Sequence, residues 1–402
     1  MNILLLSSIY PIPGPHNQGT KVCHFFAKEW VAMGHRVVAV HFQATYPGPF
    51  YWVARLFQKK LMAKTGAIVY AKKEKEPVCF EMDGVEALRI PLYKPIPHGR
   101  FPKKRIRGAV KIIDAFIRRK EFIPDVIVGH FLNPQLEVLN LLKAVYKNAK
   151  TGLVFHLPAE IDMAEGLYKE DLPILYKGID IIGFRNEPLR QYFEKVSQLN
   201  HKSFICYSGI PGTYVTRINH HTFNSPLTNF IYVGGLIERK FPIKILDALH
   251  DVYPNGGFKM KYVGCGSQKE AIEDKIQKYN MQGAVSLHGK IERDRILPLY
   301  DWADFMIMIS KGEAYGLVYL EAMSRGCITI ASRDEGMDGI IRDGFNGFLC
   351  RAGDAVELAS ILKHINSLSQ EEIIAISANA IRTASDLTDK LVAEKYLNDV
   401  IS

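Results

Sequence analysis

The chain has 402 residues, of which 48% are hydrophobic and 23% charged, and its formal net charge is +9. This length suggests more than one domain, because single hydrophobic cores rarely grow beyond about 250–300 residues. The ordinary composition excludes fibrous, disordered and repeat proteins. No apolar run approaches the roughly 20 residues that a membrane-spanning helix needs.

The basic charge is concentrated in the first half, where residues 50–120 hold 18 Lys and Arg against 6 Asp and Glu. The six cysteines form no Cys-x-x-Cys pair and no cluster with His, so neither a zinc site nor a disulfide framework is indicated. Residues 1–9 are apolar, lack a basic leader and run into Pro11, Pro13 and Pro15, which predicts a buried strand rather than a signal peptide. We therefore expect a cytoplasmic protein.

In chain order, the first half alternates apolar runs with segments of helical periodicity. The pattern predicts strands at 3–6, 37–40, 126–128, 152–155 and 179–182, and helices at 22–33 and 136–146. Continuous Val, Ile and Leu runs separated by helices are typical of a parallel sheet that is covered on both faces.

The same alternation restarts in the second half. We expect strands at 230–233, 260–263, 285–287, 305–309 and 327–331, and helices at 243–253, 271–279 and 317–325. Glycines and a proline mark a hinge within 200–213. The predicted fold class is α/β, with two Rossmann-like parallel-sheet domains, 1–200 and 201–380, facing across a cleft, and a helical segment 381–402 that returns to the first domain. Ligands of such sheets bind beyond the carboxyl ends of the strands.

The segment 310–326 has the strongest functional signal. Glu313 lies in a loop after a predicted strand, and Glu321 lies eight residues later on a predicted helix. The spacing alone means little, because a chain with 23 Glu contains about one such pair by chance. The context is more informative, since a second apolar run follows the helix directly.

The start of that predicted helix suits an anion. The backbone N–H groups of Gly316, Leu317 and Val318 have no partners within the helix, and the helix dipole places partial positive charge there. These residues form a site suited to a diphosphate.

This arrangement resembles the donor-site signature of the retaining glycosyltransferases of family 4, which have the GT-B fold. The resemblance covers most of the chain, and as an ordered set its motifs are far more specific than any one of them. They are Leu5-Leu6-Ser7-Ser8-x-Tyr10-Pro11 with Gly19, Gly34-His35-x-Val37, Pro124-Asp125-Val126 with His130, Val233-Gly234-x-Leu236 with Lys240, Gly264-x-Gly266-Ser267, His288-Gly289 and Asp343-Gly344-x-Asn346-Gly347.

The resemblance implies roles for residues of the second half. Glu313 would hold hydroxyls of the donor sugar, and Glu321 the ribose hydroxyls, since a carboxylate accepts two hydrogen bonds from a vicinal diol. The alternative for both is a solvated charge. Lys240 would bind the diphosphate and offset charge on the leaving nucleotide. Relatives carry an Arg where this chain has Gly235, and Arg239 either replaces it or faces solvent.

The resemblance also assigns residues around the sugar and the base. Gly19 would lie in a glycine loop facing the diphosphate, the alternative being a plain turn. His156 would bond the donor sugar or attend the acceptor, whereas His130 is evenly balanced between a site and a structural role. Gly266 would lie near the nucleotide, and the backbone of Ile291 would read the base. We favour UDP over GDP.

No cofactor is expected. The segment 264–269 ends in Lys269 where a dinucleotide fingerprint needs Gly or Ala, which argues against a nicotinamide enzyme. The chain also has no Asp-x-Asp, the carboxylate pair that would present a divalent metal to the nucleotide. We predict activity without an obligatory metal.

Two basic segments, 50–64 and 100–120, mix apolar residues with Lys and Arg. Basic amphipathic helices of this kind can lie in an anionic membrane interface. The alternative is that their apolar side chains pack on the sheet of the first domain while the lysines are solvated. No nucleic-acid motif accompanies the charge, so nucleic acid is not an expected partner.

The resemblance implies a retaining glycosyltransferase. It would move a hexose from a nucleotide diphosphate sugar to a glycan or lipid-linked acceptor in bacterial surface polysaccharide biosynthesis (capsule or lipopolysaccharide), in the cytoplasm or peripherally on the inner face of the membrane. Two alternatives stay open: a nucleotide-sugar epimerase of GT-B architecture, and an inactive glycosyltransferase-like subunit that binds a membrane or a partner protein.

Overall fold

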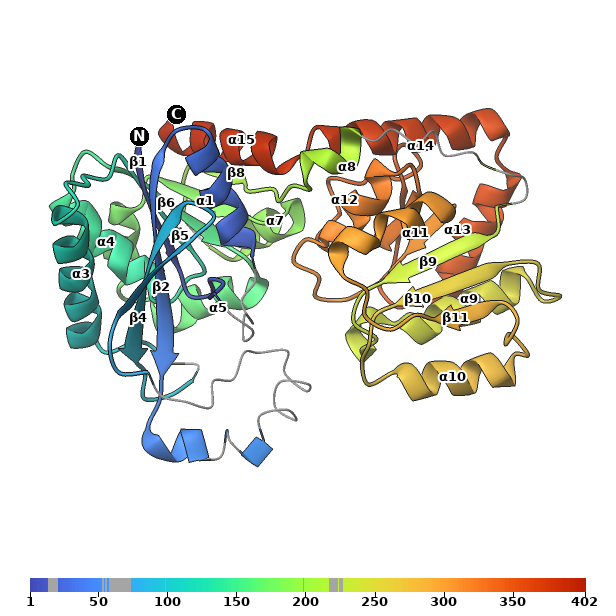
Figure 1. Cartoon of the computed structure of the whole chain (residues 1–402), viewed down its shortest axis with the longest axis horizontal. Coiled ribbons are helices and arrows are strands. Elements are labelled where there is room, and N and C mark those ends of the chain that lie inside the picture. Colours follow the sequence, from blue (N-terminus) through green and yellow to red (C-terminus); the bar gives the residue numbers. More distant parts are fainter. Residues whose placement is uncertain are drawn as a thin grey trace. The chain divides into compact units, whose positions relative to one another are not determined.

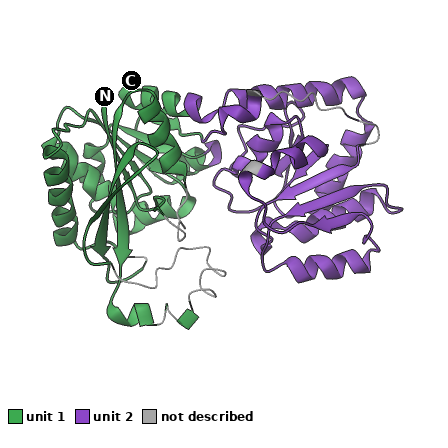
Figure 2. Cartoon of the chain, viewed as in Figure 1, with its two compact units in different colours: residues 1–185, 189–207, 392–402 green, residues 186–188, 208–391 purple. Residues whose placement is uncertain are grey.

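The chain forms two compact units (Figure 1; Figure 2). The computed structural model describes residues 1–13, 21–52, 54, 56–57, 74–97, 99–197, 199–216, 223 and 227–402. The first unit comprises residues 1–185, 189–207 and 392–402, and the second comprises 186–188 and 208–391. The main crossing between them therefore follows residue 207, which lies within the hinge segment 200–213.

The first unit is built on an eight-stranded sheet of order β3-β4-β2-β1-β5-β6-β7-β8. All neighbouring strands are parallel except the β3–β4 hairpin, whose tight turn has Asp83 and Gly84 at positive φ. The sequence analysis did not find this hairpin or β8, which lies within the predicted hinge. The strands are β1 (Asn2–Ser7), β2 (Arg36–Thr45), β3 (Val78–Met82), β4 (Val85–Tyr93), β5 (Val126–His130), β6 (Lys150–Phe155), β7 (Ile181–Phe184) and β8 (Ser203–Ile205).

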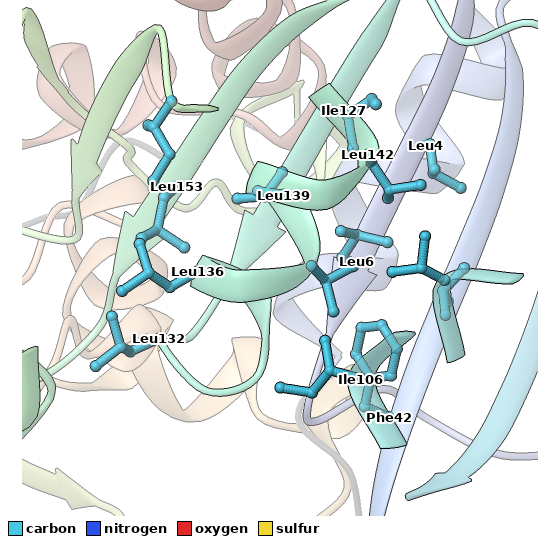
Figure 3. Packing of buried hydrophobic residues seen from close by; sticks show 14 of the residues in the cluster. Leu4, Leu6, Phe42, Ile106, Ile127, Leu132, Leu136, Leu139, Leu142 and Leu153 are labelled. Carbon is cyan, nitrogen blue, oxygen red and sulfur yellow. The ribbon is translucent and has the colours of Figure 1, made fainter. Parts of the chain in front are cut away.

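One face of this sheet is covered mainly by α3 (Lys103–Arg118) and α4 (Gln135–Val145), and α5 (Pro158–Leu167) and α7 (Glu187–Val196) add to the same core. Figure 3 shows leucines of α4 packed among strand side chains of β1, β5 and β6. Leu136, Leu139 and Leu142 of α4 are each fully buried. Burial of this apolar surface is the main force that holds the layer together.

The opposite face is covered by α1 (Val22–Ala32) and by the C-terminal helix α15 (Asp389–Ile401). The Trp30 indole of α1 donates a hydrogen bond to the carbonyl of Ala393 at 2.9 Å, and the rings of Phe26 and Tyr396 meet edge to face at 5.1 Å. Residues from the two ends of the chain thus share one core.

Helix α3 contains most of the second basic segment. Its apolar side chains Ile106, Ile113, Phe116 and Ile117 are buried against the sheet. The cationic side chains lie on the exposed face. For this segment the apolar face is part of the core, as the alternative interpretation held. Most of the first segment, 50–64, lies outside the described residues.

The second unit is built on a six-stranded parallel sheet of order β11-β10-β9-β12-β13-β14. The sequence analysis predicted every strand except β14. The strands are β9 (Asn229–Val233), β10 (Lys259–Val263), β11 (Val285–Leu287), β12 (Phe305–Ile307), β13 (Ile328–Ser332) and β14 (Phe348–Cys350). The prediction of two parallel-sheet α/β domains is confirmed.

Helices connect these strands as in other doubly wound sheets. They begin where local chemistry allows: α9 has Pro242 at its first position, and Ser369 forms a capping box with Glu372 at α14. The helices are α8 (Gly212–Thr216), α9 (Pro242–Val252), α10 (Lys269–Lys278), α11 (Leu297–Trp302), α12 (Leu317–Ser324), α13 (Ala355–Ser367) and α14 (Gln370–Ser385). Among the described residues, no helix has the length and apolar character needed to cross a bilayer.

Candidate active site

The second sheet reverses its strand order between β9 and β12. From β9 the chain continues to β10 and β11 on one side, and later adds β12, β13 and β14 on the other. Ligands of open parallel sheets bind at such a point, beyond the carboxyl ends of the two strands. The segment after β9 contains Lys240, and the segment after β12 contains Glu313.

Lys240 and Glu313 form an ion pair. Nζ of Lys240 lies 3.1 Å from Oε2 of Glu313, and their side chains are only 14% and 17% exposed. Nη1 of Arg239 lies 3.9 Å from the same oxygen and donates to the carbonyls of Lys311 and Gly312, each at 3.2 Å. The structure thus brings three predicted donor residues together. The Lys240 ammonium and the Arg239 guanidinium are cations that suit an anionic ligand.

Position 235 is open. A Cβ added to Gly235 would meet nothing nearer than 3.9 Å. The Arg239 guanidinium lies instead at the loop that precedes Glu313.

The loop that contains Glu313 is held by a second carboxylate. Glu335 accepts hydrogen bonds from the backbone N–H groups of Gly312 and Glu313 at 2.9 and 2.7 Å. Burial raises the pKa of Glu335, while these two N–H donors oppose the rise. The sequence analysis assigned no role to Glu335, because nothing local shows that its side chain reaches back to residue 313.

Gly316 is the N-cap residue of helix α12 and has φ +90° and ψ 69°. A Cβ at this position would lie 2.6 Å from ring atoms of Tyr319, so both the backbone conformation and the packing require glycine. The residues Gly316, Leu317 and Val318 are only half-buried. The first turn of α12 can therefore present its unpaired N–H groups to an anion.

Glu321, on α12, is 3% exposed and has two polar neighbours. Nε of Arg293 donates to its Oε1 at 2.7 Å, and the Tyr300 hydroxyl donates to Oε2 at 3.3 Å. Burial raises the pKa of Glu321, whereas the Arg293 guanidinium lowers it. Neither partner was predicted, since a residue 28 positions away gives no local signal.

The loops after β10 and β11 lie together beside the loop after β9. The Gly264 N–H donates to the carbonyl of Gly289 at 2.7 Å. A Cβ on Gly266 would lie 2.2 Å from the Leu236 carbonyl oxygen, so this approach needs glycine. Ile291 follows in the same loop and is half-buried. The predicted nucleotide-contacting residues thus occupy adjacent loops of one unit.

His156 belongs to the first unit and is 7% exposed at the end of β6. Its Nε2 lies 3.0 Å from Nδ1 of His130, and its ring stacks on Phe131 with centroids 4.0 Å apart. Its backbone N–H donates to the carboxylate of Glu160, and burial raises the pKa of Glu160 to about 7. Gly19, the other predicted residue of this unit, lies outside the described residues.

Comparison with known proteins shows a family match for the second half of the chain. The sequence profile of glycosyl transferases group 1 matches residues 217–383, which include every donor residue described above in the second unit. Residues 217–383 thus match this family. An uncharacterized glycosyltransferase from Methanocaldococcus jannaschii is 24% identical to it over 291 residues, covering 68% of this chain and 74% of the relative.

Other similarities cover less sequence or show the fold alone. This glycosyltransferase is 32% identical over 143 residues to the N-acetyl-alpha-D-glucosaminyl L-malate synthase of Bacillus anthracis, which is 36% of each chain. The structure of Anabaena HepE in complex with UDP aligns with a TM-score of 0.66 and 16% identity, covering 100% of this chain and 99% of HepE. This chain thus has the fold of the GT-B glycosyltransferases.

Proposed function

We propose that this glycosyltransferase moves a hexose, with retention at the anomeric carbon, from a nucleotide diphosphate sugar to a glycan or lipid-linked acceptor. UDP is favoured over GDP as the nucleotide, consistent with the UDP bound to the HepE structure. One observation carries the proposal: Lys240, Glu313 and the start of α12 lie in segments that follow adjacent strands of one sheet.

The chemistry follows from these groups. The N–H groups of 316–318 and the Lys240 ammonium would bind the diphosphate and stabilise the charge that develops as the bond to the sugar breaks. Glu313 would accept hydrogen bonds from sugar hydroxyls, and Glu321 from the ribose diol. The acceptor would attack from the face that the nucleotide leaves. We assign no protein nucleophile.

The direct test is a panel of nucleotide sugars, measured for binding by calorimetry and for slow hydrolysis without acceptor. Lys240→Ala should lower kcat/KM by about 100-fold or more, because it removes a charge that acts on the leaving group. Lys363→Ala is the matched control, since Lys363 forms an exposed pair with Asp251 at 2.6 Å in the same unit.

Each outcome of the panel has a defined meaning. Transfer to a glycan acceptor, with NMR showing the donor's anomeric configuration in the product, supports the proposal. Conversion of the donor sugar without any acceptor would identify an epimerase, and absence of binding to every nucleotide sugar would favour the inactive subunit.

We also propose that transfer needs no divalent metal, since Lys240, Arg239 and the start of α12 can neutralise the diphosphate. Treatment with a chelator should then leave activity unchanged. Activity that is lost in chelator and restored only by Mn²⁺ or Mg²⁺ would contradict this.

Association with an anionic membrane is a further part of the proposal. With most of its apolar side chains in the core, α3 would attract a membrane mainly through charge, by exposed cations such as Lys104, Arg107 and Lys111. Flotation with phosphatidylglycerol vesicles should show binding that weakens with salt. Reversing these three charges should abolish it, whereas reversing Lys147, Lys150 and Lys169, exposed elsewhere on the unit, should not. Absence of binding at low salt would contradict the idea.

The setting that we propose is the biosynthesis of a bacterial surface polysaccharide, capsule or lipopolysaccharide. It rests on the family resemblance alone. Deletion of the gene followed by sugar analysis of the cell surface tests it, and an unchanged surface glycan would refute it.

A further inference from the structure

A chain of hydrogen bonds in the first unit joins the C-terminal helix to His156. The Tyr396 hydroxyl of α15 lies 3.1 Å from Nε2 of His130, and Nδ1 of His130 lies 3.0 Å from Nε2 of His156. All three side chains are buried, with exposed fractions of 2%, 0% and 7%. Both ring nitrogens of His130 thus have a hydrogen-bond partner. The position of the proton on the Tyr396 side therefore fixes the position of the proton on the His156 side.

Aromatic packing holds both imidazole rings in this arrangement. Phe26 of α1 stacks on His130 with centroids 5.8 Å apart, and Phe131 stacks on His156 at 4.0 Å. The ring planes are therefore set by the core, and only the positions of the protons are left to be decided.

The protons can be placed from the donor inventory. A phenol has one proton, and in the described part of the chain the Tyr396 hydroxyl has no hydrogen-bond partner except Nε2 of His130. Because a buried hydroxyl that donates to nothing is costly, Tyr396 donates and Nε2 of His130 accepts. A neutral imidazole has a single N–H, so His130 donates from Nδ1 and Nε2 of His156 accepts. The proton of His156 is then on Nδ1.

Both histidines are neutral in this environment. Burial and the nearby Arg185 guanidinium lower the pKa of His130 to about 3. Burial, His130 and Arg185 together lower the pKa of His156 well below its usual value. Burial raises the pKa of the Tyr396 phenol well above its usual value, so the phenol keeps its proton. The chain therefore consists of neutral groups, as the placement of protons requires.

We propose that Tyr396 is a positioning residue that holds His156 in the Nδ1–H tautomer, so that His156 acts as a neutral hydrogen-bond donor. A ligand oxygen, such as a sugar hydroxyl or a phosphate oxygen, is the acceptor that this nitrogen suits. Among the described residues none forms a hydrogen bond with Nδ1 of His156, which leaves it available for a ligand. The part of the inference that concerns a ligand rests on the proposed function, whereas the tautomer does not.

The tautomer can be read directly by NMR. In protein labelled with ¹⁵N-histidine, correlations from ring nitrogens to carbon-bound ring protons distinguish a protonated nitrogen from a bare one, and His156→Gln assigns the signals. We expect the wild type to show a protonated Nδ1 and a bare Nε2 at His156. Protonation at Nε2 would overturn the proposal, and this measurement needs no variant of Tyr396 that folds.

A pair of conservative variants tests the role of Tyr396. Tyr396→Phe removes only the hydroxyl and should leave His130 and His156 as mixtures of tautomers. Tyr176→Phe is the control, since Tyr176 is buried in the same unit and its hydroxyl has no hydrogen-bond partner among the described residues. An unchanged His156 tautomer in Tyr396→Phe would refute the assignment.

Kinetics then test the link to the ligand. Tyr396→Phe should lower kcat/KM by roughly tenfold, the worth of one well-placed hydrogen bond, and Tyr176→Phe should not. A changed tautomer with unchanged kinetics would overturn the role toward the ligand. If no nucleotide sugar is a substrate while the spectra are as expected, the proposed function fails and the tautomer assignment stands.

Discussion

At the scale of single residues, Glu321 shows how burial and charge compete on one carboxylate. Burial raises its pKa, and the Arg293 guanidinium, 2.7 Å away, lowers it. Tyr214 and Asp389 in turn favour the charged form of Arg293. The Cζ atom of Arg293 lies 5.7 Å from the centroid of the Tyr214 ring. In the proposed role Glu321 would bind a ribose diol best when ionised, because the carboxylate accepts hydrogen bonds through both oxygens. Arg293 would then extend the pH range in which Glu321 can bind the diol.

Arg293→Met should therefore move the acid limb of kcat/KM to higher pH. Without the cation the pKa of Glu321 rises further, and the carboxylate is ionised only above that pKa. Arg293→Lys should largely restore the profile. A pH–rate series from pH 5 to pH 8 checks this, with Arg333→Met as the control, because Arg333 pairs with Glu357 at 3.1 Å in an exposed position. Coincident acid limbs in Arg293→Met and wild type would show that Glu321 does not bind in its ionised form.

At the scale of elements, the start of α12 depends on one glycine. Gly316 has a left-handed conformation and faces the ring of Tyr319, whose hydroxyl donates to the Met308 carbonyl. The helix start, the loop after β12 and the Tyr319 ring are thus packed as one piece. An anion site made of backbone N–H groups binds its ligand well only if the backbone holds those groups in the right positions.

Gly316→Ala should cost about 1–2 kcal/mol from the left-handed conformation alone, and more if the Tyr319 ring must move. It should also lower affinity for a nucleotide diphosphate by about tenfold, because the N–H groups shift. Gly283→Ala is the control in the same unit, where an added Cβ meets nothing within 4 Å. Urea unfolding and calorimetry with UDP measure both effects, and equal behaviour of the two variants would contradict the prediction.

At the scale of the whole molecule, the first unit is completed by the end of the chain. Residues 392–402 belong to it although 208–391 form the other unit. Val392, Tyr396, Leu397 and Val400 are each no more than 5% exposed. The stability of the first unit therefore depends on residues that the chain supplies last.

Removing residues 392–402 should destabilise the first unit by about 5 kcal/mol or more, because several large buried side chains are lost at once. Trp30, which is fully buried and donates to Ala393, should become exposed. Tryptophan emission should then shift to the red, and the thermal transition of the first unit should move to lower temperature. Deletion of 401–402 alone, both exposed, is the control. An unshifted transition in the longer deletion would refute this view.

Much of the fold could be predicted from the sequence because its signals are local. Runs such as 230–233 and 305–309 are long enough to indicate buried strands, and the alternation with helices implies parallel sheets. The segment 310–326 likewise contains its own evidence, since Glu313, Gly316 and Glu321 are close in the chain. The hairpin at β3–β4 and the short strand β14 were missed, because their residues show little periodicity.

Local sequence patterns thus predicted the two α/β domains, their order and the residues that most resemble a donor site. The side chains that surround those residues became known from the folded structure. Arg293 lies beside Glu321, Glu335 holds the backbone of Glu313, and Tyr396 begins the series of hydrogen bonds that ends at His156. These partners are distant in sequence, and Tyr396 and His130 are separated by 266 positions. A periodic sequence pattern shows which side of a segment faces solvent and which side faces the core. The polar partner of a side chain depends instead on how the folded segments pack against one another.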